Sequence, residues 1–336
     1  MVGVDPLLIE TIESMLGDLC TPEVIGAAEG GLDAKVWGAL WESGMATVGL
    51  AESAGGSGGS LQDAAAIAKA VGRFAAPVPL VELSLVGGWV CEQAGIALPD
   101  GPVAVVIDAG AGPSRAYWCP SAEHLVVVGE GGVGVAPASA ATVERTGVNQ
   151  AGEPWADVTV SGVSLQPGPS PLDVRARGAL ARSLTMAGAL GQAAELSVQY
   201  CNEREQFGRA IGKFQVLQQY LAQMAGEAAA AEAAADNAVD VVASGVDAPE
   251  AIRAIAAAKT VTGRAVGTIN RLAHQIHGAI GYTDEHRLQY TTRRLWAWRD
   301  EYGSDAEWAA VLGRSVAAAG GPALWPALTT WPPVVR

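Results

Sequence analysis

The chain has 336 residues, half of them hydrophobic, and a formal net charge of −14 at pH 7. A surface of that charge repels phosphate backbones, so nucleic acid is not expected as a partner, and the length predicts two or three core-forming units. The four cysteines are scattered without a C-x-x-C spacing, which excludes a disulfide framework.

The sequence also lacks the patterns of targeting and membrane insertion. The first 18 residues have no basic start followed by an apolar core, so we expect no signal peptide. The alanine-rich stretch 226–243 is interrupted by four acidic residues and does not predict a membrane span. We therefore expect a cytoplasmic protein with no membrane partner.

Helical periodicity marks the first part of the chain. Segments 5–19 and 21–45 place apolar residues at three- and four-residue spacing, which predicts amphipathic helices. Asp5 and Thr21 each stand directly before a proline, as N-cap residues commonly do. A glycine-serine loop then leads into a further amphipathic helix. We expect an N-terminal helical domain at 1–100.

Short valine-rich runs replace the helical pattern at 101–168, with glycine and proline between them, as in strands and hairpins. The helical pattern then returns as three long helices and a shorter fourth. This order predicts a mainly α protein with a small, shortened middle β domain at 101–168. A C-terminal four-helix bundle should follow at 169–320, with an extended, proline-rich tail at 321–336.

Three other patterns were considered as sites. The loop 54–60, AGGSGGS, lacks the Lys-Ser/Thr of a P-loop, so a flexible connector is favoured over a phosphate cradle. His274 and His277 lie one helical turn apart, but a third ligand is not evident, so packing is favoured and no metal is expected. No Ser-His-Asp arrangement or cysteine nucleophile is visible.

The segment 204–218, REQFGRAIGKFQVLQ, interrupts a long helical run with two glycines and several polar residues. The planar guanidinium group of Arg204 suits a phosphate or pyrophosphate. Glycines here and in 274–283, HQIHGAIGYT, allow a ligand to approach the backbone closely. Three glutamines offer amide contacts: Gln206, Gln215 and Gln275. Taken alone, the two motifs favour a loop of the bundle over a ligand site.

The combination REQFGRAIGKFQ and QIHGAIGYT, about sixty residues apart, resembles the acyl-CoA dehydrogenase family, as does the order of helical, β and helical segments. Segment 49–72 looks like the family's N-terminal P-x-x-x-G-G-x-G loop and helix, so the resemblance spans nearly the whole chain. In that family both motifs reach across a subunit interface to the FAD pyrophosphate and adenosine of a neighbour. The resemblance thus implies these FAD contacts: Arg204, Gln206, Phe207, Gln215, Gln275 and Gly278.

The family removes two hydrogens from an acyl-CoA thioester, with a glutamate as the base for the α-proton and the flavin as hydride acceptor. The commoner base position directly precedes Gly-Thr/Ser, where this chain has Tyr302, with Glu301 one residue early. The alternative position falls near Gly178, with no carboxylate between Asp173 and Glu195. The family's Thr-Glu-Pro segment of the β domain is also missing. The resemblance implies no catalytic residue in this chain, with Glu301 as the fallback.

Such chains resemble the smaller subunits of actinobacterial heterotetrameric acyl-CoA dehydrogenases, which act on steroid side-chain CoA thioesters. This resemblance implies an accessory subunit that completes the FAD site of a homologous catalytic subunit in an α2β2 assembly. It also implies an acyl-CoA substrate and electron-transfer flavoprotein as the electron acceptor. Two alternatives stay open: a self-sufficient homotetramer with Glu301 as base, and a non-enzymatic helical assembly protein.

Overall fold

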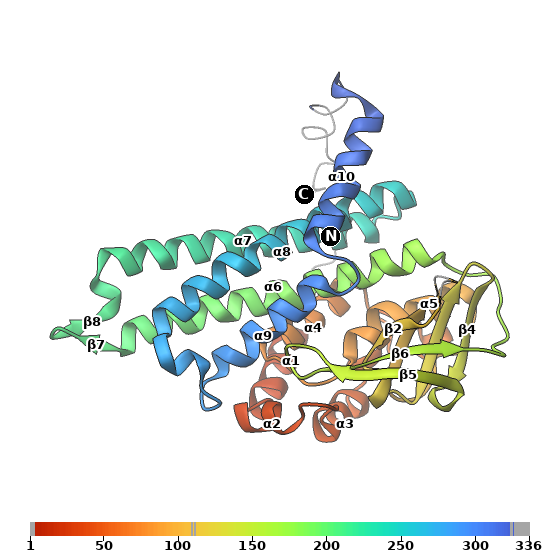
Figure 1. Ribbon diagram of the computed structural model, residues 1–336, viewed down its shortest axis with the longest axis horizontal. Coiled ribbons are helices and arrows are strands. Elements are labelled where there is room, and N and C mark those ends of the chain that lie inside the picture. Colours follow the sequence, from red (N-terminus) through yellow and green to blue (C-terminus); the bar gives the residue numbers. More distant parts are fainter. Residues whose placement is uncertain (1–3, 109, 111, 323–324, 326–336) are drawn as a thin grey trace.

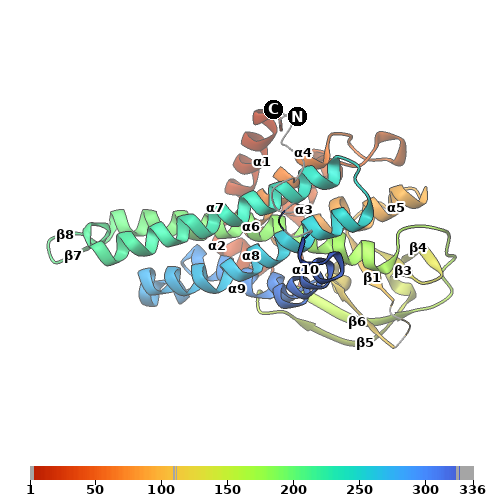
Figure 2. The same cartoon turned by 90° about the horizontal axis from the view of Figure 1, so that it is seen from above.

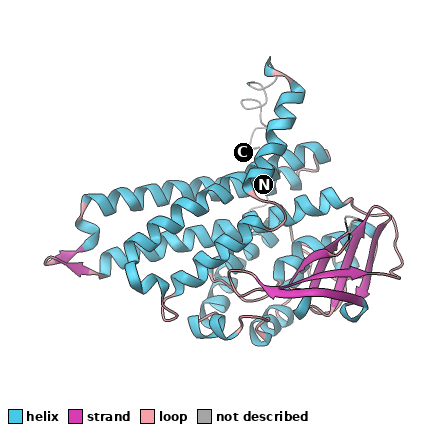
Figure 3. Cartoon of the chain, viewed as in Figure 1, coloured by secondary structure: helices cyan, strands magenta, loops and turns pink. Residues whose placement is uncertain are grey.

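The computed structural model describes residues 4–108, 110, 112–322 and 325. Helices come first along the chain, strands follow, and a bundle of long helices completes it (Figure 1). Figure 3 shows the two larger sheets on one side of this largely helical molecule and a short hairpin at its opposite end, which confirms the predicted mainly α fold with a small β part. In the described part of the chain, no helix is both long and apolar enough for a bilayer crossing.

The N-terminal helices begin at the predicted caps. Asp5 Oδ1 accepts a hydrogen bond from the backbone N–H of Leu7 at 2.9 Å, and Thr21 caps the next helix. The segment 21–45 forms two helices, because the chain turns at Gly30 with φ +89°. The elements are α1 (Pro6–Leu19), α2 (Pro22–Ala27), α3 (Ala34–Glu42), η1 (Met45–Thr47), η2 (Glu52–Ala54), α4 (Leu61–Arg73), η3 (Glu82–Gly87) and α5 (Gly88–Ala94).

Two three-stranded sheets follow. In the first, β3 pairs in parallel with β1 and antiparallel with β4; in the second, β6 lies between β2 and β5 and pairs antiparallel with both. The elements are β1 (Val103–Ile107), β2 (Ser114–Tyr117), η4 (Cys119–Ser121), β3 (His124–Gly129), β4 (Gly132–Pro137), η5 (Ala138–Ala140), β5 (Ala141–Val148) and β6 (Pro154–Val160). The turn between β5 and β6 carries Asn149, whose side chain reaches the bundle (see below).

The bundle is built from α6 (Pro171–Glu203), α7 (Gln215–Ala243), α8 (Ala248–His277), α9 (Arg287–Asp300) and α10 (Asp305–Ala319). The predicted fourth helix is therefore two helices, α9 and α10, because the chain breaks at Tyr302 with φ +55°. Helix α10 points away from the bundle (Figure 1). The predicted extended tail lies largely outside the described residues; its described members Gly321, Pro322 and Trp325 are helical.

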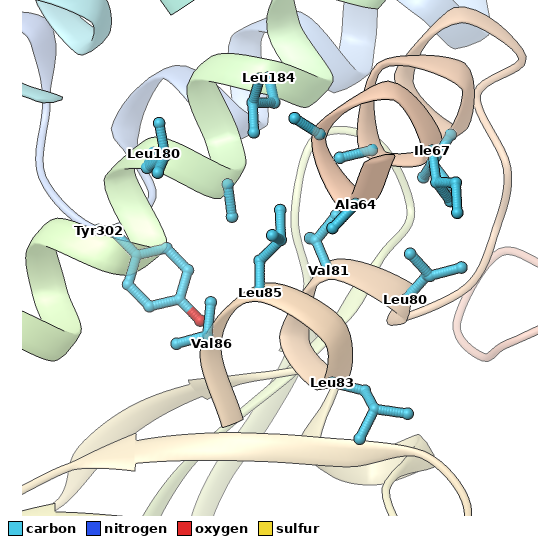
Figure 4. Packing of buried hydrophobic residues seen from close by; sticks show 14 of the residues in the cluster. Ala64, Ile67, Leu80, Val81, Leu83, Leu85, Val86, Leu180, Leu184 and Tyr302 are labelled. Carbon is cyan, nitrogen blue, oxygen red and sulfur yellow. The ribbon is translucent and has the colours of Figure 1, made fainter. Parts of the chain in front are cut away.

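Glycines bring α4 and α6 into close contact. A Cβ on Gly72 would lie 1.9 Å from the carbonyl oxygen of Thr185. A Cβ on Gly188 would lie 1.9 Å from the carbonyl oxygen of Lys69. Any side chain at either position would therefore force the two helices apart. Figure 4 shows buried residues that fill the junction between α4, η3 and α6, among them Ile67, Val81, Leu85 and Leu184.

Candidate functional site

A hairpin interrupts the helical bundle at the predicted place. Helix α6 ends at Arg204, and β7 (Glu205–Gln206) pairs with β8 (Arg209–Ala210). The turn residues Phe207 and Gly208 both have positive φ, +54° and +75°, as a tight two-residue hairpin requires. The hairpin extends past the end of the helices in both views (Figure 1 and Figure 2). The Phe207 ring is 91% exposed at its tip.

The hairpin, the start of α7 and the end of α8 surround a cavity of about 630 Å³. Five of the six residues predicted as cofactor contacts line this cavity: Arg204, Gln206, Phe207, Gln275 and Gly278. Gln215 does not line it; it is the exposed first residue of α7. The structure therefore brings together two motifs that lie about sixty residues apart in the sequence.

The polar side chains of this cavity are not engaged by the protein. The guanidinium of Arg204 and the amides of Gln206 and Gln275 form no hydrogen bond or ion pair within the described residues, and all three side chains are exposed. Gly278 has φ +62° and ψ −140°, which L-residues rarely adopt, and nothing lies within 4 Å of its Cβ position. The backbone there is thus open to a ligand.

The N-terminus of α7 also faces the cavity, through Val216 and Leu217. The N-cap residue, Phe214, supplies no side-chain hydrogen bond, so the first backbone N–H groups of this 29-residue helix have no side-chain cap. A helix N-terminus carries partial positive charge and free donors, which favour an anion. Together with Arg204, it gives the cavity the chemistry of a phosphate or pyrophosphate site.

An aromatic wall completes the cavity and was not predicted. Tyr200 stacks on His277 with ring centroids 4.6 Å apart, and both residues line the cavity. His277 Nδ1 lies 2.8 Å from the carbonyl oxygen of Ala273, and burial lowers the pKa of His277 to about 4, so the imidazole is neutral at pH 7. Tyr200 precedes Arg204 by one helical turn, and this spacing could have identified it as a lining residue.

The two positions at which the family resemblance would place a catalytic base, Gly178 and Tyr302, lie together in the interior and are filled by protein. A Cβ on Gly178 would lie 2.2 Å from Cδ1 of the buried Tyr302 ring, so the aromatic side chain rests directly on the glycine. Tyr117 packs on the other side, with the two tyrosine ring centroids 5.4 Å apart. Figure 4 shows the Tyr302 ring between α6 and η3. No open space is left beside Gly178.

Glu301 is held in a buried ionic cluster. Its Oε2 accepts a hydrogen bond from Arg182 Nε at 2.6 Å, and its Oε1 accepts one from Asn149 Nδ2 at 3.0 Å. Arg182 also pairs with Glu82 of η3, and these three charged side chains are almost completely buried. Burial raises the pKa of Glu301, while the charge of Arg182 opposes that rise. Both carboxylate oxygens are therefore occupied by protein donors.

Comparisons with known proteins show similarity to acyl-CoA dehydrogenases. Residues 176–308 match the family model described as acyl-CoA dehydrogenase, C-terminal domain. The relative named acyl-CoA dehydrogenase IpdE2, from Mycolicibacterium smegmatis, is 29% identical over 298 residues, which cover 86% of this chain and 91% of the relative.

Solved structures share the fold. A chain of the ChsE4-ChsE5 complex from Mycobacterium tuberculosis superposes with a TM-score of 0.81 at 19% identity, over 94% of this chain and 97% of that one. The Tcur3481-Tcur3483 steroid ACAD G363A variant superposes with a TM-score of 0.80 at 20% identity, over 93% of this chain and 97% of that one. The chain is thus similar to acyl-CoA dehydrogenases along most of its length, and residues 176–308 match the C-terminal domain of that family.

Proposed function

We propose that this chain is an accessory subunit of an FAD-dependent acyl-CoA dehydrogenase and completes the FAD site of a homologous catalytic subunit. One observation carries the proposal. Five predicted cofactor contacts meet at an open cavity beside a protruding hairpin. By contrast, the interior position beside Gly178, where the resemblance would place a catalytic base, is filled by the Tyr302 ring.

The residues of the cavity fit the nucleotide half of FAD. Arg204 and the uncapped N-terminus of α7 suit a pyrophosphate, and the open backbone at Gly278 lets the ligand approach α8. Tyr200 and the neutral His277 offer a flat aromatic wall for a purine ring. When bound, FAD supplies the acceptor for the hydride that leaves the acyl group.

The interior of the chain supports an accessory role. A general base must reach the proton that it abstracts, within hydrogen-bond distance or through one water. Both oxygens of Glu301 instead accept hydrogen bonds from Arg182 and Asn149 in a buried cluster. We therefore infer that the glutamate for proton abstraction comes from the partner subunit, and that this chain positions the cofactor.

The names of two structural neighbours support a proposal for the substrate and the assembly. One structural neighbour is called a steroid ACAD, and another is a complex of two differently named chains. We propose a steroid side-chain CoA thioester as the substrate, an α2β2 arrangement with the catalytic subunit, and electron-transfer flavoprotein as the electron acceptor.

Flavin content tests this proposal. The chain should purify without flavin when expressed alone and with FAD when co-expressed with a homologous partner. In the complex, Arg204→Ala should weaken FAD binding about ten- to a hundredfold, because a charge-assisted phosphate contact contributes about 1.5–3 kcal/mol. Arg264→Ala, an exposed arginine on α8 outside the cavity, is the matched control and should leave flavin binding unchanged.

Two outcomes contradict the proposal. The first is a complex that keeps its full flavin content and affinity after Arg204→Ala. The second is a lone chain that purifies with one FAD per protomer and oxidises an acyl-CoA, which would instead support the self-sufficient homotetramer.

A further inference from the structure

A second cavity, of about 520 Å³, lies at the other end of the bundle. It is formed by α5, the start of α6 and the junction of α7 with α8. Arg177 lines it and precedes Arg204, the C-cap of α6, by 27 positions, which correspond to about 40 Å along a helix. This cavity is therefore remote from the one that contains Arg204.

The wall of this cavity contains a buried cation. The Arg177 side chain is 9% exposed; its Nε donates a hydrogen bond to the carbonyl oxygen of Leu85 at 2.9 Å, and its guanidinium lies over the ring of Trp89 at 5.3 Å. Its two Nη nitrogens have no hydrogen-bond acceptor, and the side chain has no ion-pair partner, among the described residues. Burial lowers the pKa of Arg177 to about 10, so the group stays cationic at neutral pH.

The nearby charge of Glu92 on α5 offsets part of the cost of burying Arg177, but Glu92 accepts a hydrogen bond from the backbone N–H of Ala51 and forms no ion pair with Arg177 among the described residues. Burying a charged group without a partner costs several kcal/mol, and a planar guanidinium with two free Nη groups matches the two oxygens of a carboxylate. The opposite wall is apolar and consists of side chains from the α7–α8 junction: Val242, Val246, Ile252 and Ile255. The cavity therefore combines one cationic anchor with a hydrophobic surface of ligand size.

A second polar group restricts the charge of the ligand. Asp173 also lines the cavity, and its Oδ2 accepts hydrogen bonds from the backbone N–H and Oγ of Ser170 at 3.2 and 2.7 Å. This carboxylate would repel a multiply charged anion, as would the net charge of −14. A single negative charge on an apolar body fits better than a phosphate-rich ligand.

We propose that this cavity binds an amphiphile with one carboxylate, which pairs with the Nη groups of Arg177 while the apolar body packs against the α7–α8 junction. The site is separate from the cofactor contacts and does not depend on the proposed function.

Calorimetric titration of the full chain with decanoate tests the site. We expect one decanoate per chain and at least tenfold weaker binding of decan-1-ol, which has the same apolar chain without the charge. Arg177→Gln should raise the Kd for decanoate at least tenfold. Arg175→Gln should leave it unchanged, because Arg175 is outside the cavity and pairs with Glu307.

A second variant keeps the test decisive if Arg177→Gln does not fold. Ala251→Phe fills the cavity from α8, leaves Arg177 in place, and should abolish decanoate binding. Decanoate binding that is unchanged by Ala251→Phe or by a folded Arg177→Gln variant would overturn the proposal. Tighter binding of coenzyme A than of decanoate, or no decanoate binding to the wild-type chain, would overturn it as well.

Discussion

Replacing Glu301 by glutamine separates a structural role of this side chain from a catalytic one. Glu301 and Glu82 both pair with Arg182, and all three side chains are at most 4% exposed. Removing one partner of a buried ion pair typically costs 3–5 kcal/mol, because the remaining charge loses its compensation. Arg182 retains Glu82, so we expect the lower end of that range, about 3 kcal/mol.

The expected change in melting temperature follows from the chain length. A chain of 336 residues has an unfolding entropy of about 0.7 kcal/mol/K, so a loss of about 3 kcal/mol should lower Tm by about 4 °C. Differential scanning calorimetry measures this shift. Glu232→Gln is the matched control: Glu232 forms an exposed ion pair with Lys69, and its loss should change stability by less than about 1 kcal/mol.

Turnover then distinguishes the two roles. In the flavin-loaded complex with its partner, Glu301→Gln should leave the rate of acyl-CoA oxidation unchanged at temperatures well below Tm. Loss of turnover with unchanged flavin content and unchanged Tm would refute this reasoning and identify Glu301 as a base. In that case the self-sufficient enzyme would replace the accessory subunit.

Two further predictions concern the interior of the chain. Gly178→Ala should destabilise the chain by about 1–3 kcal/mol, measured by urea unfolding, because the new methyl group meets the Tyr302 ring; unchanged stability would show that the ring moves aside freely. Burial lowers the pKa of Lys259 to about 7, whereas an unfolded lysine titrates near 10.4, so the unfolded chain binds more protons between these values and stability should rise with pH there. Between pH 7 and pH 9 the free energy of unfolding of the wild-type chain should rise by about 2 kcal/mol relative to that of Lys259→Met. Urea midpoints that shift equally with pH in both proteins would contradict this prediction.

The local features of the fold and the cavity could be predicted from the sequence. N-caps such as Asp5 depend on a few neighbouring residues, and so does the hairpin turn at Phe207–Gly208. Each of the segments 204–218 and 274–283 carries polar residues beside glycine, and this shared pattern indicates that the two segments line one site. Gln215 does not line the cavity, whereas the next two residues of α7 do, so its role as a cofactor contact stays a prediction.

Long-range features could not be predicted in this way. Strand β5 has no alternating apolar pattern that would mark its bounds, because its residues are mostly exposed and mix threonine with charged side chains. The break at Tyr302 was missed because a non-glycine residue with positive φ is uncommon and depends on tertiary contacts. The bond between Asn149 and Glu301 joins residues 152 positions apart, and no local pattern indicates it.

The buried cluster suggests why a base at position 301 and this packing exclude each other. Glu301 follows α9, Arg182 lies in α6, Glu82 in η3 and Asn149 in the β5–β6 turn, so the cluster joins all three parts of the chain. A carboxylate that abstracts a proton needs a free oxygen and access to its substrate, whereas a carboxylate that joins these elements needs both oxygens engaged and water excluded. The second requirement is met here, which supports the proposal that the chain contributes to catalysis through the polar groups at the hairpin end.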